Sequence, residues 1–310
     1  VYTDPEEDKL ALYLPTIFTA YKLWINGEPA TSVGTVGSSR PNTVPRGMTR
    51  TVQFSPASGV TEIVIQIANF HHMRGGMLKP LLLGTPERID ARTDKLLAFE
   101  MFVIGTLIIM GLYHVAIGLI RRKDRASLYY GIFAIVWGTR GLLVGQVVWT
   151  KLFPAFPWEW QIKMEYCALY GGILTFVLYL YHLFPGMTPR PFVRLSQLLA
   201  VVSIGPVLAT PASVYSRFLV YHELTIVGQI VFMMYIVWRV VRQKQDGAVL
   251  LFVLASFAAL TCINDFLYYA EVWTALGNMS PIGLFVFTIG QVFLLSRRFA
   301  ASFTMVERYS

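Results

Sequence analysis

Seven long apolar stretches follow one another along this chain, and they limit its possible folds more than any other feature. A hydrocarbon core about 30 Å thick is crossed by roughly 20 helical residues, a length that these stretches approach or exceed. Only 14% of the 310 residues are charged, whereas soluble domains carry roughly a quarter. The sequence therefore predicts membrane-spanning helices over residues 97–120, 127–148, 159–184, 192–209, 215–238, 247–270 and 279–298.

The distribution of Lys and Arg predicts the orientation, because loops on the cytoplasmic side of a membrane carry an excess of these residues. One set of loops holds twelve: Arg121, Arg122, Lys123, Arg125, Arg190, Arg194, Arg239, Arg242, Lys244, Arg297, Arg298 and Arg308. The opposite loops hold Lys151, Lys163 and Arg217. Three further cations before the first stretch are interleaved with acids. We expect the N-terminus outside and the C-terminus in the cytoplasm, and the net charge of +8 then reflects topology, not nucleic-acid binding.

Residues 1–95 have the composition of a soluble domain and the pattern of short strands. Residues 10–27 predict strands broken at Pro15, and the last strand alternates Tyr21, Leu23 and Ile25 before a tight turn at Asn26-Gly27. Further strands are predicted in TRTVQF, TEIVIQIANF and LLLG, separated by Gly- and Pro-rich turns. This pattern predicts an all-β sandwich.

The segment IQIANFHHMRGGM, residues 65–77, places two histidines and an arginine beside a double glycine. Adjacent residues of an extended strand point to opposite faces, so His71 and His72 would not share one metal ion. A structural zinc ion would need four ligands, and the N-terminal part offers no cysteine and no third histidine. We therefore interpret the segment as a strand that leads into a glycine turn, and expect no metal.

The series YKLWINGE, GTVGSS, EIVIQIANFHHMRGGM and LLLG, followed directly by seven spans, resembles the bacterial seven-transmembrane receptors with diverse intracellular signalling modules. In that family a periplasmic jelly-roll domain of carbohydrate-binding type precedes the helices, and a cytoplasmic output domain follows them. The resemblance implies a partial all-β jelly-roll ectodomain followed by an all-α seven-helix transmembrane bundle. It also implies that the Asn-Phe-His corner is fold-defining, with Asn69, His71, His72 and Arg74 at the corner and with Asn69 and Arg74 bonding neighbouring loops.

The expected organisation is a periplasmic β-sandwich over residues 1–95, seven spans over 96–298, and the start of a cytoplasmic signalling helix over 299–310. About 95 residues would hold only the later part of such a jelly roll, so we expect its early strands upstream. The resemblance further implies an inner-membrane receptor that contacts lipid, binds a periplasmic small molecule, of which a carbohydrate-like compound is one candidate, and works as a homodimer. Its output enzyme would be a nucleotide cyclase, a diguanylate cyclase, a histidine kinase or a phosphatase.

Ionisable residues inside predicted spans are costly and suggest function. Arg140, Glu165, Glu223 and Asp265 lie on four different spans, roughly 9–13 Å below the outer boundary at 1.5 Å per residue. His222 and Asn264 adjoin them in sequence, and Gln146 and Tyr166 are near. Two interpretations remain open, a buried ion-pair network that fixes helix packing, and a ligand pocket or switch that links the ectodomain to the helices. Arg140 should be sensitive to mutation under either interpretation.

Other classes of protein fit less well. A retinal protein needs a lysine in its seventh helix, and residues 279–298 contain none. A haem between helices needs two facing histidines at one depth, which His114 and His182 do not offer. A transporter or a membrane-embedded enzyme remains the alternative, with Gly205-Pro206 as a weak hint of a broken helix. No catalytic motif is recognisable in the 310 residues, and no cofactor is expected.

Overall fold

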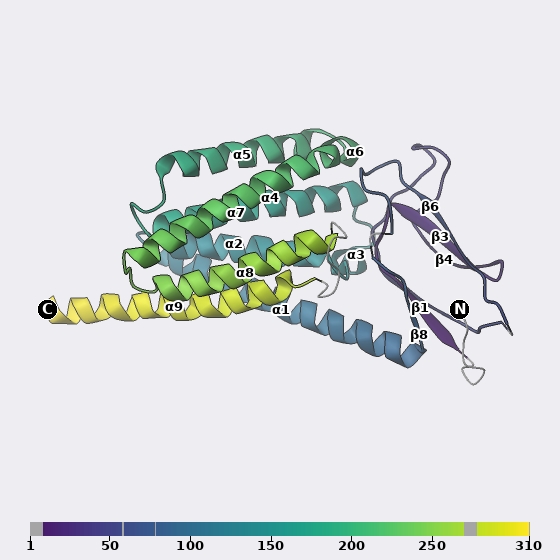
Figure 1. Cartoon of the computed structure of the whole chain (residues 1–310), viewed down its shortest axis with the longest axis horizontal. Coiled ribbons are helices and arrows are strands. Elements are labelled where there is room, and N and C mark those ends of the chain that lie inside the picture. The colour runs from purple at the N-terminus through teal and green to yellow at the C-terminus, as the bar shows by residue number, and fades with distance from the viewer. Residues whose placement is uncertain (1–8, 58, 78, 270–277, 310) are drawn as a thin grey trace. The chain divides into compact units, whose positions relative to one another are not determined.

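The computed structural model describes residues 9–57, 59–77, 79–269 and 278–309 (Figure 1). Strands occupy the N-terminal part up to Gly84, and helices follow. The chain divides into two compact units. The first comprises the described residues within 1–101, 140–167 and 205–220, and the second those within 102–139, 168–204 and 221–310. Several helices therefore begin in one unit and continue in the other.

The strands pair in three antiparallel sheets within the described part of the first unit. One three-stranded sheet has the order β5-β1-β8, another has the order β4-β3-β6, and β2 pairs with β7. The strands are β1 (Leu10–Leu14), β2 (Ile17–Phe18), β3 (Ala20–Ile25), β4 (Glu28–Val33), β5 (Arg50–Phe54), β6 (Ile63–Ala68), β7 (Gly76–Met77) and β8 (Leu82–Gly84). The predicted strands are thus confirmed, including the interruption at Pro15.

The hairpin between β3 and β4 shows how the sequence specifies this part. Asn26 and Gly27 have φ of 51° and 81°, the left-handed values that a two-residue type I′ turn requires. The alternating residues before the turn are buried, with Tyr21 and Leu23 fully so. They form one core with further side chains of the β part: Leu12, Leu14, Ile17, Ile25 and Val33, and the partly buried Met48, Val52, Phe54, Ile63, Ile65, Ile67, Leu81 and Leu83.

The helices begin directly after the strands. They are α1 (Pro86–Ile120), α2 (Arg125–Leu143), α3 (Val148–Leu152), α4 (Trp158–Leu183), α5 (Arg190–Ala209), α6 (Ala212–Tyr215), the 3₁₀ helix η1 (Ser216–Phe218), α7 (Leu219–Arg242), α8 (Ala248–Tyr269) and α9 (Ser280–Tyr309). The first helix starts earlier than the predicted span, because residues 86–96 continue it although they are polar. α5 continues through Gly205-Pro206 as one helix, with Pro206 in its interior.

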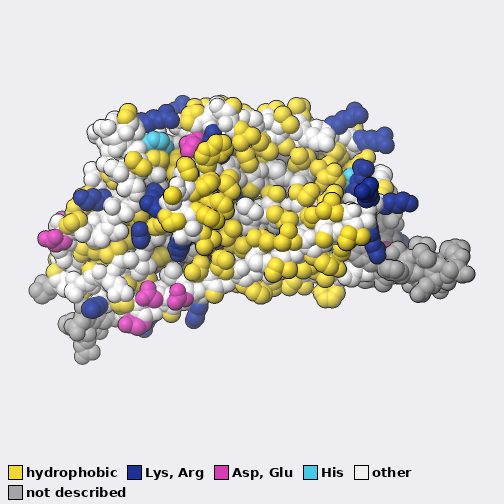
Figure 2. All heavy atoms as spheres, turned by 180° about the vertical axis from the view of Figure 1, so that it is seen from behind, with side chains coloured by type: hydrophobic (Ala, Val, Ile, Leu, Met, Phe, Trp, Pro, Cys, Tyr) yellow, Lys and Arg dark blue, Asp and Glu magenta, His cyan; other side chains and the backbone are white. Residues whose placement is uncertain are grey.

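Five helical segments of the described chain are long and apolar enough to cross a membrane: α1, α4, α5, residues 212–242 and Ala248–Tyr268. The apolar part of α9, Ser280–Leu294, is shorter, and the 19-residue α2 is not among the five. Hydrophobic side chains nevertheless cover a broad surface of the molecule, and Lys and Arg gather beside it (Figure 2). An apolar surface of this kind is suited to lipid, because soluble monomers rarely expose large apolar patches.

The predicted second span ends too late. α2 stops at Leu143, and Gly145 and Val147 adopt φ of 66° and 50° before α3 begins. A Cβ on Gly145 would lie 2.4 Å from Glu100 Oε1, so this position needs glycine for both its backbone and its neighbour. The apolar run conceals this turn, because Val144 and Val147 count as span residues. Arg140 consequently lies in the last turn of α2, not roughly 13 Å inside a span.

Glycines bring α1 and α2 into close contact in the second unit. A Cβ on Gly131 would lie 2.6 Å from Val115 N and 2.7 Å from Gly111 O. A Cβ on Gly118 would lie 2.8 Å from Leu128 Cα. These neighbours are backbone atoms, which cannot move aside independently. The pair therefore packs as membrane helices commonly do, with small residues at the interface.

Aromatic rings fill much of the second unit's core. The ring of Phe176 lies 5.2 Å from that of Phe133 and 5.6 Å from that of Phe287, so α2, α4 and α9 meet there. The core also contains Ala126, Tyr130, Ile173, Val177, Tyr179, Leu180, Leu183, Phe184, Met187, Phe192, Val193, Met233, Ile236, Val237, Val240, Ala248, Leu251, Leu254, Ala255 and Leu294.

Candidate coupling site

The corner after β6 is built around the amide of Asn69. Its Nδ2 donates to the carbonyl oxygens of His72 (2.8 Å) and Arg74 (3.1 Å), and its Oδ1 accepts from the His72 N–H (3.2 Å). A Cβ on Gly75 would lie 2.4 Å from Asn69 Nδ2, so the glycine leaves room for this amide. Three bonds from one side chain hold the loop in a fixed shape. They stay within the corner itself, whereas the resemblance implied bonds to neighbouring loops.

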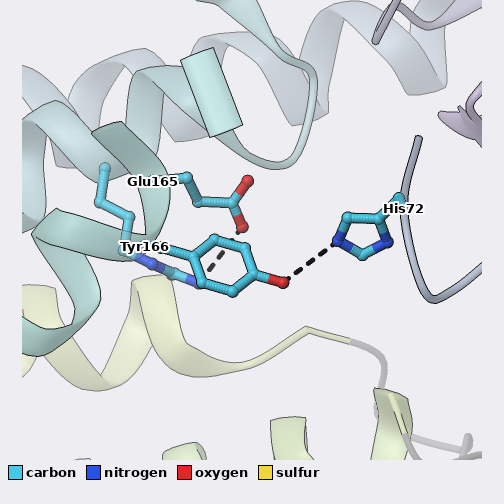
Figure 3. Close-up of polar contacts among 4 residues, drawn as sticks. His72, Glu165 and Tyr166 are labelled. Atoms are coloured by element: carbon cyan, nitrogen blue, oxygen red, sulfur yellow. Dashed lines mark hydrogen bonds and ion pairs between the residues drawn. The ribbon is translucent and has the colours of Figure 1, made fainter. Parts of the chain in front are cut away.

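His72 connects this corner to α4. Its Nε2 lies 3.1 Å from the Tyr166 hydroxyl (Figure 3). Its Nδ1 lies 3.1 Å from both the backbone N and the carbonyl O of Arg74. If Nδ1 accepts from the Arg74 N–H, Nε2 donates to Tyr166; in the other tautomer the tyrosine hydroxyl donates to Nε2. Burial lowers the pKa of His72 below its ordinary value, although the bond to the Arg74 backbone opposes this. A neutral ring is therefore favoured.

The neighbours of His72 in sequence contact other helical residues of the same unit. The His71 ring meets the edge of the Trp158 ring at 6.3 Å. The Met73 N–H donates to Ser216 Oγ at 2.9 Å. The two histidines thus take separate partners, and the described residues contain no group of three His, Cys, Asp or Glu side chains arranged to hold a metal ion.

The first unit holds α4 and the α6–η1 segment together by further contacts around Tyr166. The Tyr166 ring lies 5.1 Å from the Tyr215 ring, and Glu159 Oε1 accepts the Ala212 N–H at 2.7 Å. The corner loop is therefore bonded both to α4 and to a segment that is itself fixed to α4.

Arg140 and Glu165 form an ion pair beside this contact. Arg140 Nη2 lies 3.8 Å from Glu165 Oε1, and both side chains are about a quarter exposed, 24% and 23%. Glu165 precedes Tyr166, so the last turn of α2 and the corner loop both meet the same turn of α4. Figure 3 shows Glu165 and Tyr166 extending from that turn, with the Tyr166 hydroxyl directed at His72.

Further polar contacts within the first unit join its β part to helices and turns. Gln146 Nε2 donates to the Tyr13 hydroxyl at 3.0 Å, and the Gln146 N–H donates to Glu100 Oε2 at 3.0 Å. Arg46 Nη2 reaches the Pro154 carbonyl at 3.3 Å. Strand β1, helix α1 and the turn after α2 thus share one hydrogen-bonded group.

The remaining four predicted site residues belong to the second unit. His222 Nδ1 lies 2.9 Å from Ser203 Oγ and joins α7 to α5. Asp265 accepts the N–H groups of Met279 (2.6 Å) and Ser280 (3.0 Å) and an N–H of the neighbouring Asn264 (3.2 Å). Asp265 thereby satisfies the first N–H groups of α9, as capping residues do. Glu223 is half-buried.

The two histidines weighed as haem ligands also lie in the second unit. The His114 ring is packed against the rings of Tyr113 and Tyr130 at 5.1 and 4.9 Å. The His182 ring stacks on the Tyr129 ring at 5.1 Å. Each of the two histidine rings thus packs against tyrosine rings, and the two sets of tyrosines differ.

Sequence reasoning missed several residues of these contacts. Ser216 and Tyr13 gave no signal, because a serine at a helix end and a tyrosine in a strand are common. Gln291 did offer one, since it is an amide within an apolar stretch. It is fully buried, and its Oε1 accepts from the Tyr179 hydroxyl, which joins α4 to α9.

Comparison with known protein families identifies the family to which the chain belongs. A model of the family described as 7TM diverse intracellular signalling matches residues 96–298. The chain belongs to this family. It is accordingly a multi-pass membrane protein of signal transduction, and the resemblance inferred from its sequence motifs is confirmed. No curated protein and no solved structure matches it.

Proposed function

We propose that this member of the 7TM diverse intracellular signalling family is a receptor for a periplasmic small molecule. A ligand, of which a carbohydrate is one candidate class, binds the β-sheet part or a pocket formed by this part and the helix ends. It favours one of two helix arrangements, and α9 transmits that choice to a cytoplasmic output domain. Binding can shift such an equilibrium only if the ligand has different affinities for the two arrangements.

The observation that carries this proposal is the hydrogen-bonded corner of the first unit. His72 bonds Tyr166, and Met73 bonds Ser216, while Asn69 makes the loop rigid. A displacement of the strands that carry this loop would either break these bonds or move the helix ends with it. A rigid corner bonded to α4 and to η1 is therefore suited to receive the signal.

Helix α4 supplies the route by which the input reaches the output helix. It carries Tyr166, which meets the corner loop, and also Tyr179, which meets Gln291 of α9. Helices are stiff, so a tilt or rotation imposed at one residue is felt along the helix. α9 continues past its apolar part to Tyr309, in the manner of a helix that leaves the membrane.

Several finer features belong to the same proposal. The two three-stranded sheets around one core are compatible with the later part of a jelly roll. The excess of Lys and Arg in alternate loops supports a periplasmic N-terminus and an inner-membrane location. The apolar spacing of Phe299, Phe303 and Val306 supports a coiled coil, and hence a homodimer.

A fusion tests the proposal directly. A diguanylate cyclase domain is attached after Ser310, the protein is produced in bacterial membranes, and the cyclic dinucleotide is measured with and without a panel of mono- and oligosaccharides. His72→Ala removes a bond worth about 1 kcal/mol, which shifts a two-state equilibrium about fivefold. We expect a change of that order in basal output, in either direction.

The matched control is a pair of asparagines. Asn69→Ala removes three side chain-to-backbone bonds at a turn of the β part. Asn26→Ala removes one, because Asn26 Oδ1 accepts the Glu62 N–H at 2.9 Å, and it also places an alanine at a left-handed φ of 51°, so it disturbs its own turn as well. Only the turn of Asn69 meets the helices. Asn69→Ala should alter output at unchanged membrane levels, whereas Asn26→Ala should not. Equal output from both variants and from the parent fusion would contradict the coupling proposal.

A further inference from the structure

The outer face of α7 combines an exposed apolar stripe with arginines at one end. Tyr221, Leu224, Val227 and Val231 are exposed, and Tyr235 and Trp238 continue the stripe at 48% and 45% exposure. Residues three and four apart share a face of a helix, so Tyr235, Trp238, Arg239 and Arg242 lie on one side of its last two turns.

The rings hold the arginines in place. The Arg239 guanidinium lies 5.9 Å from the centre of the Tyr235 ring, and the Arg242 guanidinium lies 5.4 Å from that of Trp238. The rings themselves are neighbours, 6.1 Å apart. Such cation–π contacts restrict a long side chain and leave its N–H groups available to an anion. The result is two positioned guanidinium groups at the end of an apolar stripe.

The chemistry of this surface fits an amphiphile with an anionic head. Helix α7 is part of an apolar segment long enough to cross a membrane, and Trp and Tyr favour the membrane interface. The acyl chains would lie along Tyr235 and Val231, and the phosphate would meet Arg239 and Arg242. A zwitterionic lipid offers the same chains without the net charge.

We propose that the last two turns of α7 form a binding site for an anionic phospholipid, with Arg239 and Arg242 as ligands of its phosphate. The site does not depend on the receptor proposal or on the orientation of the chain. Each basic residue near a membrane surface favours an anionic lipid by about fivefold. Two positioned arginines should therefore enrich such a lipid at Trp238 at least about fivefold over a zwitterionic one.

Quenching of Trp238 fluorescence tests the site. The chain is reconstituted in phosphatidylcholine vesicles that contain a small fraction of brominated lipid, either phosphatidylglycerol or phosphatidylcholine. The signal of Trp238 is the difference between the parent chain and Trp238→Phe. We expect brominated phosphatidylglycerol to quench it at about one fifth of the concentration needed for brominated phosphatidylcholine or less, and to do so less in high salt.

Two variants with equal loss of charge sharpen the result. Arg239→Gln/Arg242→Gln should remove the preference for phosphatidylglycerol, and Arg121→Gln/Arg122→Gln, in the loop between α1 and α2, should retain it. Equal quenching by the two lipids in the parent chain overturns the proposal, as does a Trp238 that neither lipid reaches because a second copy covers it. The parent-chain comparison decides these outcomes even if the double variant fails to fold.

Discussion

Two tyrosines of one helix show how differently the two units use polar groups. Tyr166 of the first unit bonds a half-buried histidine on a loop, and that loop is held by side chain-to-backbone bonds. Tyr179 of the second unit is fully buried and bonds Gln291, which is fully buried as well. Aromatic rings and close helix contacts surround the second pair. The first contact thus has one half-buried partner, whereas both partners of the second are fully buried.

This difference suggests a division of work between the units. Contacts that water can replace cost little to break, so they suit a movable input. Contacts inside a packed aromatic core cost the full desolvation of each group when broken, so they keep helices together and make them move jointly. The second unit should therefore lose more stability than the first when such a contact is removed.

The largest effect is expected where helices touch through glycine. Gly131→Ala would place a Cβ 2.6 Å from Val115 N, and overpacking of this kind typically costs 1–3 kcal/mol or more. We expect a loss of folded protein, measured by unfolding in mixed micelles. Gly171→Ala is the control, because nothing lies within 4 Å of its Cβ and alanine is favoured over glycine in helices by about 0.5–1 kcal/mol. Equal stability of the two variants would contradict the close contact of α1 and α2.

The next effect compares the same substitution at the two tyrosines. Tyr179→Phe leaves the buried Gln291 oxygen without its donor, which costs about 1–3 kcal/mol. Tyr166→Phe leaves a histidine that can turn to water, so about 0.5–1 kcal/mol is expected. Equilibrium unfolding of both variants measures the difference. A larger loss for Tyr166→Phe would reverse the division of work proposed above.

A smaller effect is expected for the ion pair between Arg140 and Glu165. Both side chains are partly exposed and the closest atoms are 3.8 Å apart, so their coupling energy should be about 1 kcal/mol or less. The double-mutant cycle of Arg140→Met and Glu165→Gln measures it. A coupling of about 3 kcal/mol or more would instead indicate a fully desolvated pair, and the first unit would then contain an interaction as costly to break as any in the second.

The same contrast explains what the sequence could and could not reveal. Periodicity and composition were enough for most strands, for most helices and for the turn at Asn26-Gly27, because these depend on local patterns; β4 (Glu28–Val33) and the two-residue β7 (Gly76–Met77) were not predicted. The end of α2 was not predicted correctly, because the turn at Gly145 lies against Glu100, a residue distant in sequence. The apolar run gave no hint of it.

Candidate site residues divided in a similar way. The expectation for Asn69 rested on a recurring motif, and the structure gives its amide three bonds to the corner. The membrane residues were grouped by depth alone, which cannot say which helices are neighbours. Arg140 meets Glu165, whereas Asp265 binds the start of α9, a role that depends on tertiary structure and leaves no trace in the count of residues per span.

The smallest effect concerns pH and the corner loop. Burial lowers the pKa of His72, while the unfolded chain keeps the ordinary value of about 6.5. Above that value the ring is neutral in both states, so the stabilising contribution of the neutral ring is complete. As pH falls below about 6.5 the unfolded chain takes up a proton that the folded chain does not, and stability is lost toward the lowered pKa.

Unfolding measured between about pH 8 and pH 5 should show this loss, and His72→Gln should reduce the slope of stability against pH. His71, whose pKa is also lowered by burial, remains in both chains, so the difference isolates His72. An unchanged slope would mean that the corner loop opens to water in the folded protein, and the contact with Tyr166 would not then join the loop to α4.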